Sequence, residues 1–416
     1  MHASIPELLI PAGSLRKLRV ALAYGADAVY VGAAGFSMRP DGASFPTADL
    51  RLAVDEVHRQ GKRIYVALNS LIHQDGLPAL HAWLDETVDI AMDALIVADP
   101  AALLLVRQHR PEVEIHISTQ LSTANALAAR FWQAAGASRV ILARECTLDE
   151  VNQIATESGV PIEIFVHGAM CVAVSGRCLL SAYMTGHSAS EGECKHSCRW
   201  DWQLVEAKRP GEAFPVFETG KETIVLSSTD LCLIEHIPRV VRTGAASLKI
   251  EGRMKGEYYV AVVTRVYRAA LDAYAADPLL YRTDPAWLAE LHSLRHHPYA
   301  TGFAFGYPTE SPEVLQARYI DIGTHDVVGI VEGREEQAYR VLVKHPFRYD
   351  AILEWIGPGY AGGTVTIDSI QDQEGQGLNQ THPGTTVLVR LASQADIPPL
   401  AMFRRRKPVE DTLRQR

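Results

Sequence analysis

The stretch Ile162-Glu163-Ile164-Phe165-Val166-His167-Gly168 decides the fold, because it is a short, largely apolar run that ends on a glycine. Seven further runs of this kind lie along the chain, at Leu8–Ala12, Ala28–Gly32, Arg63–Asn69, Ala94–Asp99, Glu114–Gln120, Arg139–Glu145 and Ser247–Arg253. Largely apolar strands that alternate with helices are typical of a parallel sheet covered on its outside. Eight such units predict an α/β fold, a TIM-like (β/α)8 barrel.

The segments between these strands carry helix signals. Ser14 precedes a run whose apolar residues share one helix face, and Gly25 follows it as a stop. A second apolar stripe at helical spacing follows the last strand, at Tyr259, Val262, Val263, Val266 and Ala270. A doubly wound open sheet is the alternative, but no G-x-G-x-x-G sequence follows any of the strands. We therefore expect the barrel domain to span residues 5–320.

Composition narrows the class of protein. The chain has 416 residues, of which 47% are hydrophobic and 21% charged, and its net charge is -9. These values exclude a mainly disordered chain and a uniformly basic nucleic-acid coat. No segment reaches the roughly 18 apolar residues of a membrane span, and the first residues lack the features of a signal peptide. We expect a cytoplasmic protein without a membrane partner and with reduced thiols.

The last part of the chain, residues 321–405, is predicted to form a separate small all-β domain with the architecture of a barrel. Its predicted strands are Val327–Val331, Ala338–Val343, Ile352–Ile356, Gly363–Ile367 and Thr386–Leu391. The basic tail Arg404–Lys407 is interpreted as a solvated chain end, with a weak contact to an RNA backbone as the alternative.

A long insertion, residues 169–245, separates the seventh and eighth strands. It contains most of the cysteines and a predicted hairpin with arms at Trp202–Glu206 and Thr223–Ser227. Because it follows the carboxyl end of a barrel strand, we expect it on the catalytic face.

Cysteines are concentrated in this insertion. Of six cysteines, five lie between Cys171 and Cys232, which favours a metal over disulfides in a reduced compartment. Zinc and an iron–sulfur cluster are both compatible with four converging thiolates, and the wide, uneven spacing favours the cluster. Cys171, Cys178 and Cys194 are the first three candidate ligands. The alternative is that these cysteines are reduced thiols that bind no metal. The remaining thiol, Cys146, is interpreted as a buried structural residue.

Charged side chains lie at or just past the predicted strand ends, where a barrel enzyme has its active site. They are Arg144, Glu145, His167, Glu251 and Arg253. Arg144 and Arg253 can clamp carboxylates in a bidentate manner, and the alternative is an Arg–Glu network that closes the barrel mouth. His167 is either a proton donor or a packed, hydrogen-bonded histidine. Arg177 can neutralise cluster charge, and Asn69 and Gln120 can bind a base edge.

The pattern Glu163-x-Phe165-x-x-Gly168-Ala169-Met170-Cys171, continued by Gly176-Arg177-Cys178-Leu179-x-Ser181, is long and specific. Together with Asp230-Leu231-Cys232 and Lys249-Ile250-Glu251-Gly252-Arg253, it resembles the collagenase-like peptidase family, class U-32. The resemblance covers nearly the whole chain, including the β domain. Within the family the sequence is most similar to a branch that hydroxylates tRNA rather than cleaving peptides.

This resemblance implies an enzyme that converts the wobble uridine in the tRNA anticodon loop to 5-hydroxyuridine. It further implies prephenate as a co-substrate and a 4Fe–4S cluster, with Cys232 as its fourth ligand and Cys198 as the competitor. Arg253, Glu251, Arg144 and His167 are the catalytic candidates, and Arg144, Arg253 and Arg177 are the candidates for cofactor binding. Candidate phosphate contacts are Arg199, Lys208, Arg209, Lys249 and Lys255.

Three alternatives remain open at this stage. A peptidase is one, although the sequence contains neither an H-E-x-x-H helix nor a G-x-S-x-G elbow. A Cys–His nucleophile pair needs no proximity in sequence and stays open. The others are hydroxylation of ribosomal RNA or of a quinone precursor. A homodimer or heterodimer is considered as the assembly.

Overall fold

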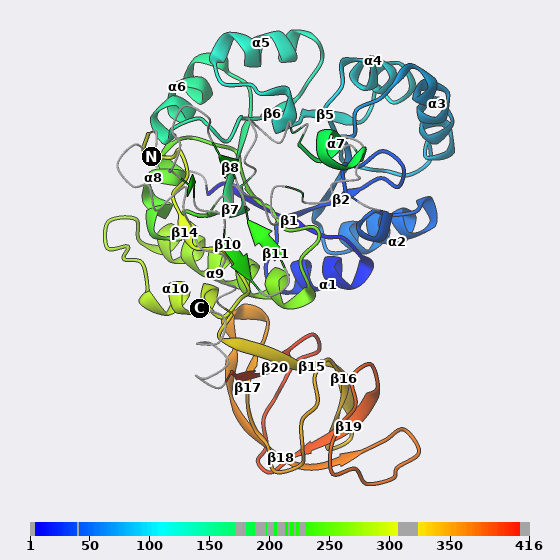
Figure 1. Ribbon diagram of the computed structural model, residues 1–416, viewed down its shortest axis with the longest axis vertical. Helices are drawn as coiled ribbons and strands as arrows, with labels where there is room; N and C mark the ends of the chain where they lie inside the picture. Colours follow the sequence, from blue (N-terminus) through cyan, green and yellow to red (C-terminus); the bar gives the residue numbers. More distant parts are fainter. Residues whose placement is uncertain are drawn as a thin grey trace.

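Two closed barrels make up the computed structural model (Figure 1). It describes residues 5–39, 41–170, 178, 180–187, 197, 204–205, 213–214, 217–219, 222–224, 229–306 and 323–407. The larger barrel is formed by the first three quarters of the chain, and the smaller one follows it.

Eight parallel strands close the larger barrel. They are β1 (Glu7–Pro11), β2 (Ala28–Gly32), β3 (Arg63–Leu68), β4 (Ala94–Val97), β5 (Glu114–Ile117), β6 (Arg139–Ile141), β7 (Ile162–Ala169) and β13 (Ser247–Ile250). Strands β1 to β7 pair in chain order, and β13 closes the barrel by pairing in parallel with both β7 and β1. The predicted (β/α)8 fold is confirmed, and each predicted strand contains or overlaps the observed one.

Helices surround this barrel. They are α1 (Leu15–Ala23), α2 (Thr47–His58), α3 (Leu77–Glu86), α4 (Pro100–His109), α5 (Ala126–Ala134), α6 (Leu148–Ser158), α8 (Ile237–Arg242), α9 (Glu257–Ala276) and α10 (Pro285–Leu291). Ser14 caps α1 as predicted, its hydroxyl accepting from the Lys17 amide. The predicted stripe on α9 is buried throughout. Among the helices in the described ranges, none has both the length and the apolar character to cross a bilayer.

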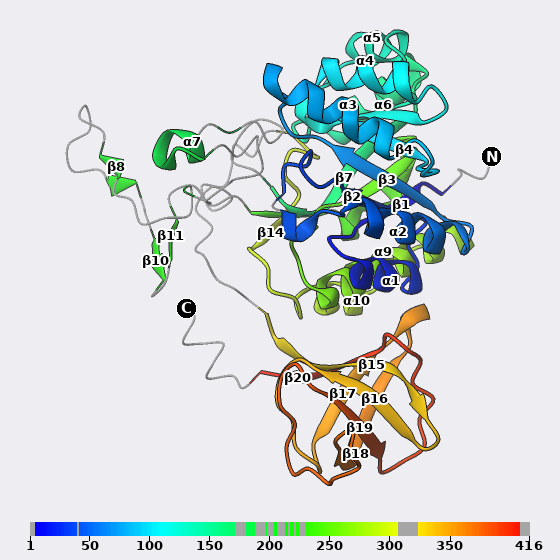
Figure 2. The same cartoon turned by 90° about the vertical axis from the view of Figure 1, so that its right-hand side faces the viewer.

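The insertion after β7 projects from one face of the barrel (Figure 2). Its described elements are α7 (Leu180–Thr185) and the short strands β8 (Leu204–Val205), β9 (Ala213–Phe214), β10 (Phe217–Thr219) and β11 (Glu222–Ile224). The predicted single hairpin is wrong, because β8 pairs with β9 and β10 pairs with β11. Each arm pairs with the segment nearest to it along the chain, which closes the shorter loop.

The chain returns to the barrel wall before residue 245. Strand β12 (Asp230–Cys232) runs antiparallel to β7, and the short β14 (Tyr299–Ala300) pairs with β12 on its far side. Helix α8 then occupies the seventh helical position of the barrel. The segment 230–242 therefore belongs to the barrel wall.

Six antiparallel strands close the smaller barrel. They are β15 (His325–Glu335), β16 (Ala338–Val343), β17 (Ile352–Ile356), β18 (Gly362–Gln371), β19 (Thr386–Leu391) and β20 (Met402–Arg406). The interpretation of Arg404–Lys407 as a solvated end is wrong for Arg404, which is buried in β20, a strand that pairs with β15 and β17; Arg405 and Arg406 are exposed. Met402 and Phe403 are buried. Strand β20 begins with these two apolar residues and ends with three arginines, so the basic half of its sequence hid the strand pattern.

The two barrels share a buried interface. The hydroxyl of Tyr24, the residue at the C-terminal end of α1, shares its one proton between the carbonyl oxygens of Ile356 (3.2 Å) and Leu400 (3.0 Å) in the smaller barrel. Arg404 on β20 forms a bidentate ion pair with Glu290 on α10, with distances of 2.8 and 3.0 Å. The Arg404 side chain is 11% exposed and its partner 13%. The first tail residue is therefore committed to holding the domains together.

Candidate functional site at the mouth of the barrel

Glu251 lies just past the carboxyl end of β13, between two guanidinium groups. Its Oε1 lies 2.9 Å from Nη2 of Arg39, and its Oε2 lies 3.6 Å from Nη2 of Arg144. The backbone is held as well, because the Glu251 amide donates to the His167 carbonyl (2.9 Å) and Tyr259 donates to the Glu251 carbonyl (2.6 Å). The strand ends thus bring Arg144, Glu251 and β7 together, as the sequence predicted.

Arg39 was missed in the sequence. It lies in the long connection after β2, seven residues past Gly32. The signal available was the length of that connection, because long loops at the carboxyl ends of barrel strands carry functional residues. Arg39 adds a third guanidinium group to those of Arg144 and Arg253 and so increases the positive charge at the barrel mouth.

The surrounding charges fix the ionisation state of Glu251. Burial raises the pKa of this carboxyl group, but Arg39, Arg144 and Arg253 more than offset that effect and bring its pKa to about 2. Glu251 is therefore ionised at neutral pH and is poorly suited to donate a proton. Its role in this arrangement is to orient the guanidinium groups of Arg39 and Arg144 through the two ion pairs.

Arg253 follows Glu251 into the interior and is 3% exposed. It forms no ion pair with any carboxylate of the described residues, and its Nη1 has no hydrogen-bond partner there. Burial lowers its pKa. Among the described residues, three guanidinium groups thus lie around one carboxylate, and their formal charges sum to about +2. Buried charge is costly unless it is compensated, so this arrangement favours an anionic ligand.

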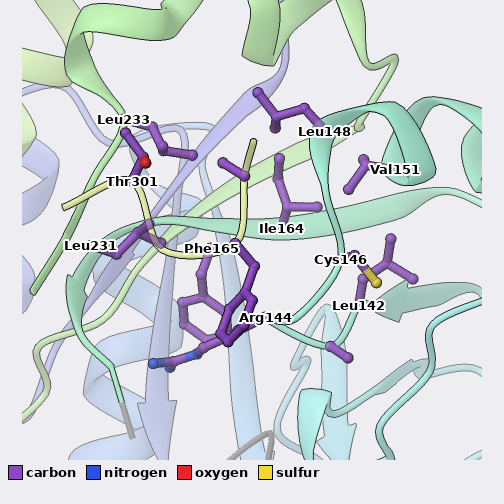
Figure 3. A pocket seen from close by; sticks show the side chains of 13 residues that line it. Leu142, Arg144, Cys146, Leu148, Val151, Ile164, Phe165, Leu231, Leu233 and Thr301 are labelled. Atoms are coloured by element: carbon purple, nitrogen blue, oxygen red, sulfur yellow. The ribbon is translucent and has the colours of Figure 1, made fainter. Parts of the chain in front are cut away.

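Arg144 is anchored by β7 as well as by Glu251. Its Nη1 donates to the Ala169 carbonyl (2.7 Å), and its guanidinium lies 3.9 Å from the centre of the Phe165 ring. Figure 3 shows its side chain beside Phe165, with the guanidinium pointing away from the aliphatic residues of the adjoining pocket. That pocket lies between β6, β7 and α6 and holds only about 30 Å³, roughly one water. It is too small to bind a substrate.

His167 on β7 is buried among three tyrosine rings. The centres of the Tyr299, Tyr267 and Tyr259 rings lie 5.3, 5.5 and 6.0 Å from that of its imidazole. Burial lowers its pKa to about 3, despite the opposing effect of Asp230. His167 is therefore neutral at physiological pH, an arrangement that supports a packed histidine over a proton donor.

The described part of the insertion contains two of the five candidate ligands. Cys178 is half-buried, and Cys232 on β12 is buried and hydrogen-bonded to Tyr267. Cys171, Cys194, Cys198 and Arg177 lie outside the described residues, whose His, Cys, Asp and Glu side chains form no metal-binding group of three or more. Cluster binding therefore stays a prediction. Its donor set fits, since residues 171–232 supply five thiols and a 4Fe–4S cluster needs four.

Two described thiols are unsuited to the role of a peptidase nucleophile. Burial raises the pKa of Cys146 to about 12 and that of Cys232 to about 11. A nucleophilic cysteine instead needs a lowered pKa, so that its thiolate form is populated. These two residues fit structural or ligand roles.

Several predicted RNA contacts are used inside the fold. Lys249 is 4% exposed and donates to Glu163 (2.8 Å) in the barrel interior, so its assignment to a phosphate is wrong. Asn69 and Gln120 bond to each other, with Nδ2 of Asn69 lying 2.8 Å from Oε1 of Gln120, and are not presented to a base. Lys255 is half-buried at the mouth. Arg199, Lys208 and Arg209 lie outside the described residues.

The model of peptidase family U32 matches residues 13–313, and that of the peptidase family U32 C-terminal domain matches residues 323–404. The tRNA hydroxylation protein P1 of Bacillus subtilis is 37% identical over 97% of this chain and 95% of its own length. The tRNA hydroxylation protein P of Escherichia coli is 35% identical over 90% of each chain. A 23S rRNA 5-hydroxycytidine synthase of the same species is 36% identical over 64% of this chain and 39% of its own.

Proposed function

The chain belongs to peptidase family U32, and from that membership and its arginine-lined barrel mouth we propose that it is a tRNA hydroxylation enzyme. The two relatives of this name described above match 97% and 90% of the chain. The observation that carries the proposal is the barrel mouth, where the guanidinium groups of Arg39, Arg144 and the buried Arg253 lie around one carboxylate. This arrangement suits an anionic co-substrate and differs from the activated nucleophile that a peptidase requires.

The proposed reaction converts the wobble uridine to 5-hydroxyuridine. The base has to leave the anticodon stack to reach a catalyst in the barrel. A barrel mouth can receive one such base, while exposed aromatic rings stack on its neighbours. Tyr183 on α7, 86% exposed at the same face, is suited to that stacking role.

Prephenate is the proposed co-substrate. It carries two carboxylates, and the charges of the described residues Arg39, Arg144, Arg253 and Glu251 sum to about +2. Guanidinium groups bind carboxylates through paired hydrogen bonds, so the match is one of geometry as well as charge.

A 4Fe–4S cluster is the proposed redox group, held by Cys171, Cys178, Cys194 and either Cys232 or Cys198. When bound, it would serve as a centre for one-electron transfer. Protein purified without oxygen should be brown with about four irons per chain, and Cys171→Ala should lose the colour. Spectra of Cys198→Ala and Cys232→Ala decide the fourth ligand. Stoichiometric zinc in a colourless preparation would contradict the cluster.

The nucleoside profile of tRNA tests the function. In a host that lacks its own enzymes for this modification, the wild-type gene should restore 5-hydroxyuridine-derived nucleosides in digested tRNA, measured by mass spectrometry. Arg253→Ala should fail to restore them while keeping the cluster spectrum, whereas Arg348→Ala, an exposed arginine of the smaller barrel, should behave as wild type. A host unable to convert chorismate to prephenate should show no restoration. A changed ribosomal RNA profile with unchanged tRNA would move the substrate to ribosomal RNA.

A further inference from the structure

Two buried donors without partners converge next to Gly32, at the carboxyl end of β2. Nη1 of Arg253 and Oγ of Ser44 are both buried and have no hydrogen-bond partner among the described residues. A Cβ placed on Gly32 would lie 2.2 Å from that Nη1 and 2.9 Å from the Ser44 Oγ. The Ser37 Oγ lies 2.7 Å from the same point. A guanidinium and two hydroxyls therefore gather around a position that only glycine leaves open.

The backbone holds these groups in place. The Phe45 amide donates to the Gly32 carbonyl (2.7 Å), and the Ala34 amide donates to the Phe45 carbonyl (3.2 Å). Ser44 is therefore fixed against the end of β2. Ser37 and Ser44 are 6% and 8% exposed.

Arg110 shows that this fold can give each nitrogen of a buried guanidinium a hydrogen-bond partner. It is 2% exposed, yet its Nε donates to Glu112 (2.6 Å) and its Nη1 and Nη2 donate to the carbonyls of Thr87 (2.8 Å) and Ile90 (2.9 Å). Arg253 lies almost as deep, at 3% exposed, but its Nη1 has no such partner among the described residues. An unmade hydrogen bond to a buried charged group is costly, so an open guanidinium beside an open hydroxyl indicates a site for a ligand.

We propose that Arg253, Ser44 and Ser37 form a subsite for one carboxylate of a small-molecule ligand. The guanidinium supplies charge, and the serine hydroxyls supply further donors to the carboxylate oxygens. The residues are too deep for a backbone phosphate of RNA, which is flanked by bulky sugars, whereas a terminal carboxylate can reach them. The inference rests on the proposed function only in the choice of prephenate as the first ligand to test.

Isothermal titration calorimetry on the full chain tests the subsite, with prephenate, phenylpyruvate, malonate and inorganic phosphate as probes. Ser44→Ala should weaken carboxylate binding about tenfold or more, since a hydrogen bond to a charged group is lost. Gly32→Ala should abolish binding, because the added methyl group displaces the guanidinium. Ser158→Ala, a buried serine at the end of α6, should bind as wild type.

A stability measurement separates a binding role from a structural one. Because the Ser44 hydroxyl has no partner, Ser44→Ala should leave the melting temperature of the ligand-free protein unchanged or raise it. Unchanged carboxylate affinity in Ser44→Ala, or binding of phosphate but of no carboxylate, would overturn the subsite. If malonate or phenylpyruvate binds with the same sensitivity to Ser44→Ala while prephenate does not, the subsite stands and the prephenate proposal fails.

Discussion

Glu163→Gln should strongly destabilise the larger barrel, because Glu163 is the counter-charge of the buried Lys249 and shares the buried Arg139 with Glu7. The carboxylate is 0% exposed and lies 2.8 Å from Nζ of Lys249 and 3.1 Å from Nη1 of Arg139. Burial raises the pKa of Glu163, but Lys249 and Arg139 overcome that effect and lower it from 4.5 to about 2. Such a drop corresponds to about 3 kcal/mol in favour of the ionised form. Removing one partner of a buried ion pair generally costs about 3–5 kcal/mol of folding free energy, a range that includes the figure from the pKa.

Equilibrium urea unfolding at pH 7, followed by fluorescence and far-UV circular dichroism, measures this loss. Glu157→Gln, an exposed carboxyl on α6, is the matched control and should change the free energy of unfolding by less than about 0.5 kcal/mol. The double variant Glu163→Gln/Lys249→Met should recover at least half of the loss, since it removes the stranded ammonium together with its partner.

The pH dependence supplies a second check. Since folding lowers the pKa of Glu163, its contribution is complete above about pH 4.5 and is lost as the pH falls towards 2. The difference between wild type and Glu163→Gln should therefore shrink below pH 4.5. A loss of less than about 1 kcal/mol at pH 7 would refute the reasoning.

Three further predictions follow from the contacts described above. Tyr24→Phe should lower the free energy of unfolding by about 1–2 kcal/mol in urea titrations, because two carbonyl oxygens at the domain interface lose their donor; no change would contradict that role. The His167 imidazole should show no NMR titration between about pH 5 and 9, and a midpoint near its ordinary value would disprove its burial. Tyr183→Ala should weaken tRNA binding about 5- to 150-fold in a filter-binding assay, while Tyr349→Ala, on the smaller barrel, should not; equal effects would remove the stacking role.

The larger barrel could be predicted from the sequence because its signals are local. A strand buried on both sides has to be apolar over consecutive residues, and eight such runs alternate with helices. The smaller barrel was predicted for the same reason, except for β20, where a basic run outweighed the apolar pair Met402–Phe403. Pairing within the insertion went wrong because strands of two or three residues carry too little pattern to set a partner.

For the candidate site, too, some features could be predicted from the sequence and others could not. That Arg144, His167, Glu251 and Arg253 meet at one end of the barrel follows from the sequence, because parallel strands place their carboxyl ends together. What each side chain does there was decided by tertiary contacts. Burial among tyrosine rings makes His167 neutral, and the guanidinium groups around Glu251 keep it ionised.

Only the tertiary structure revealed Arg39, the open donors of Ser44 and Arg253, and the use of Lys249 inside the barrel. None of these carries a local signal, because a lysine on a strand reads the same whether its ammonium faces water or Glu163. The physical reason is that strand and helix periodicity depends on neighbours in the chain, whereas charge compensation and hydrogen bonding depend on groups brought together from distant segments. The sequence by itself determined the architecture and the end of the barrel that bears the site, and the packing determined the charge that the site presents.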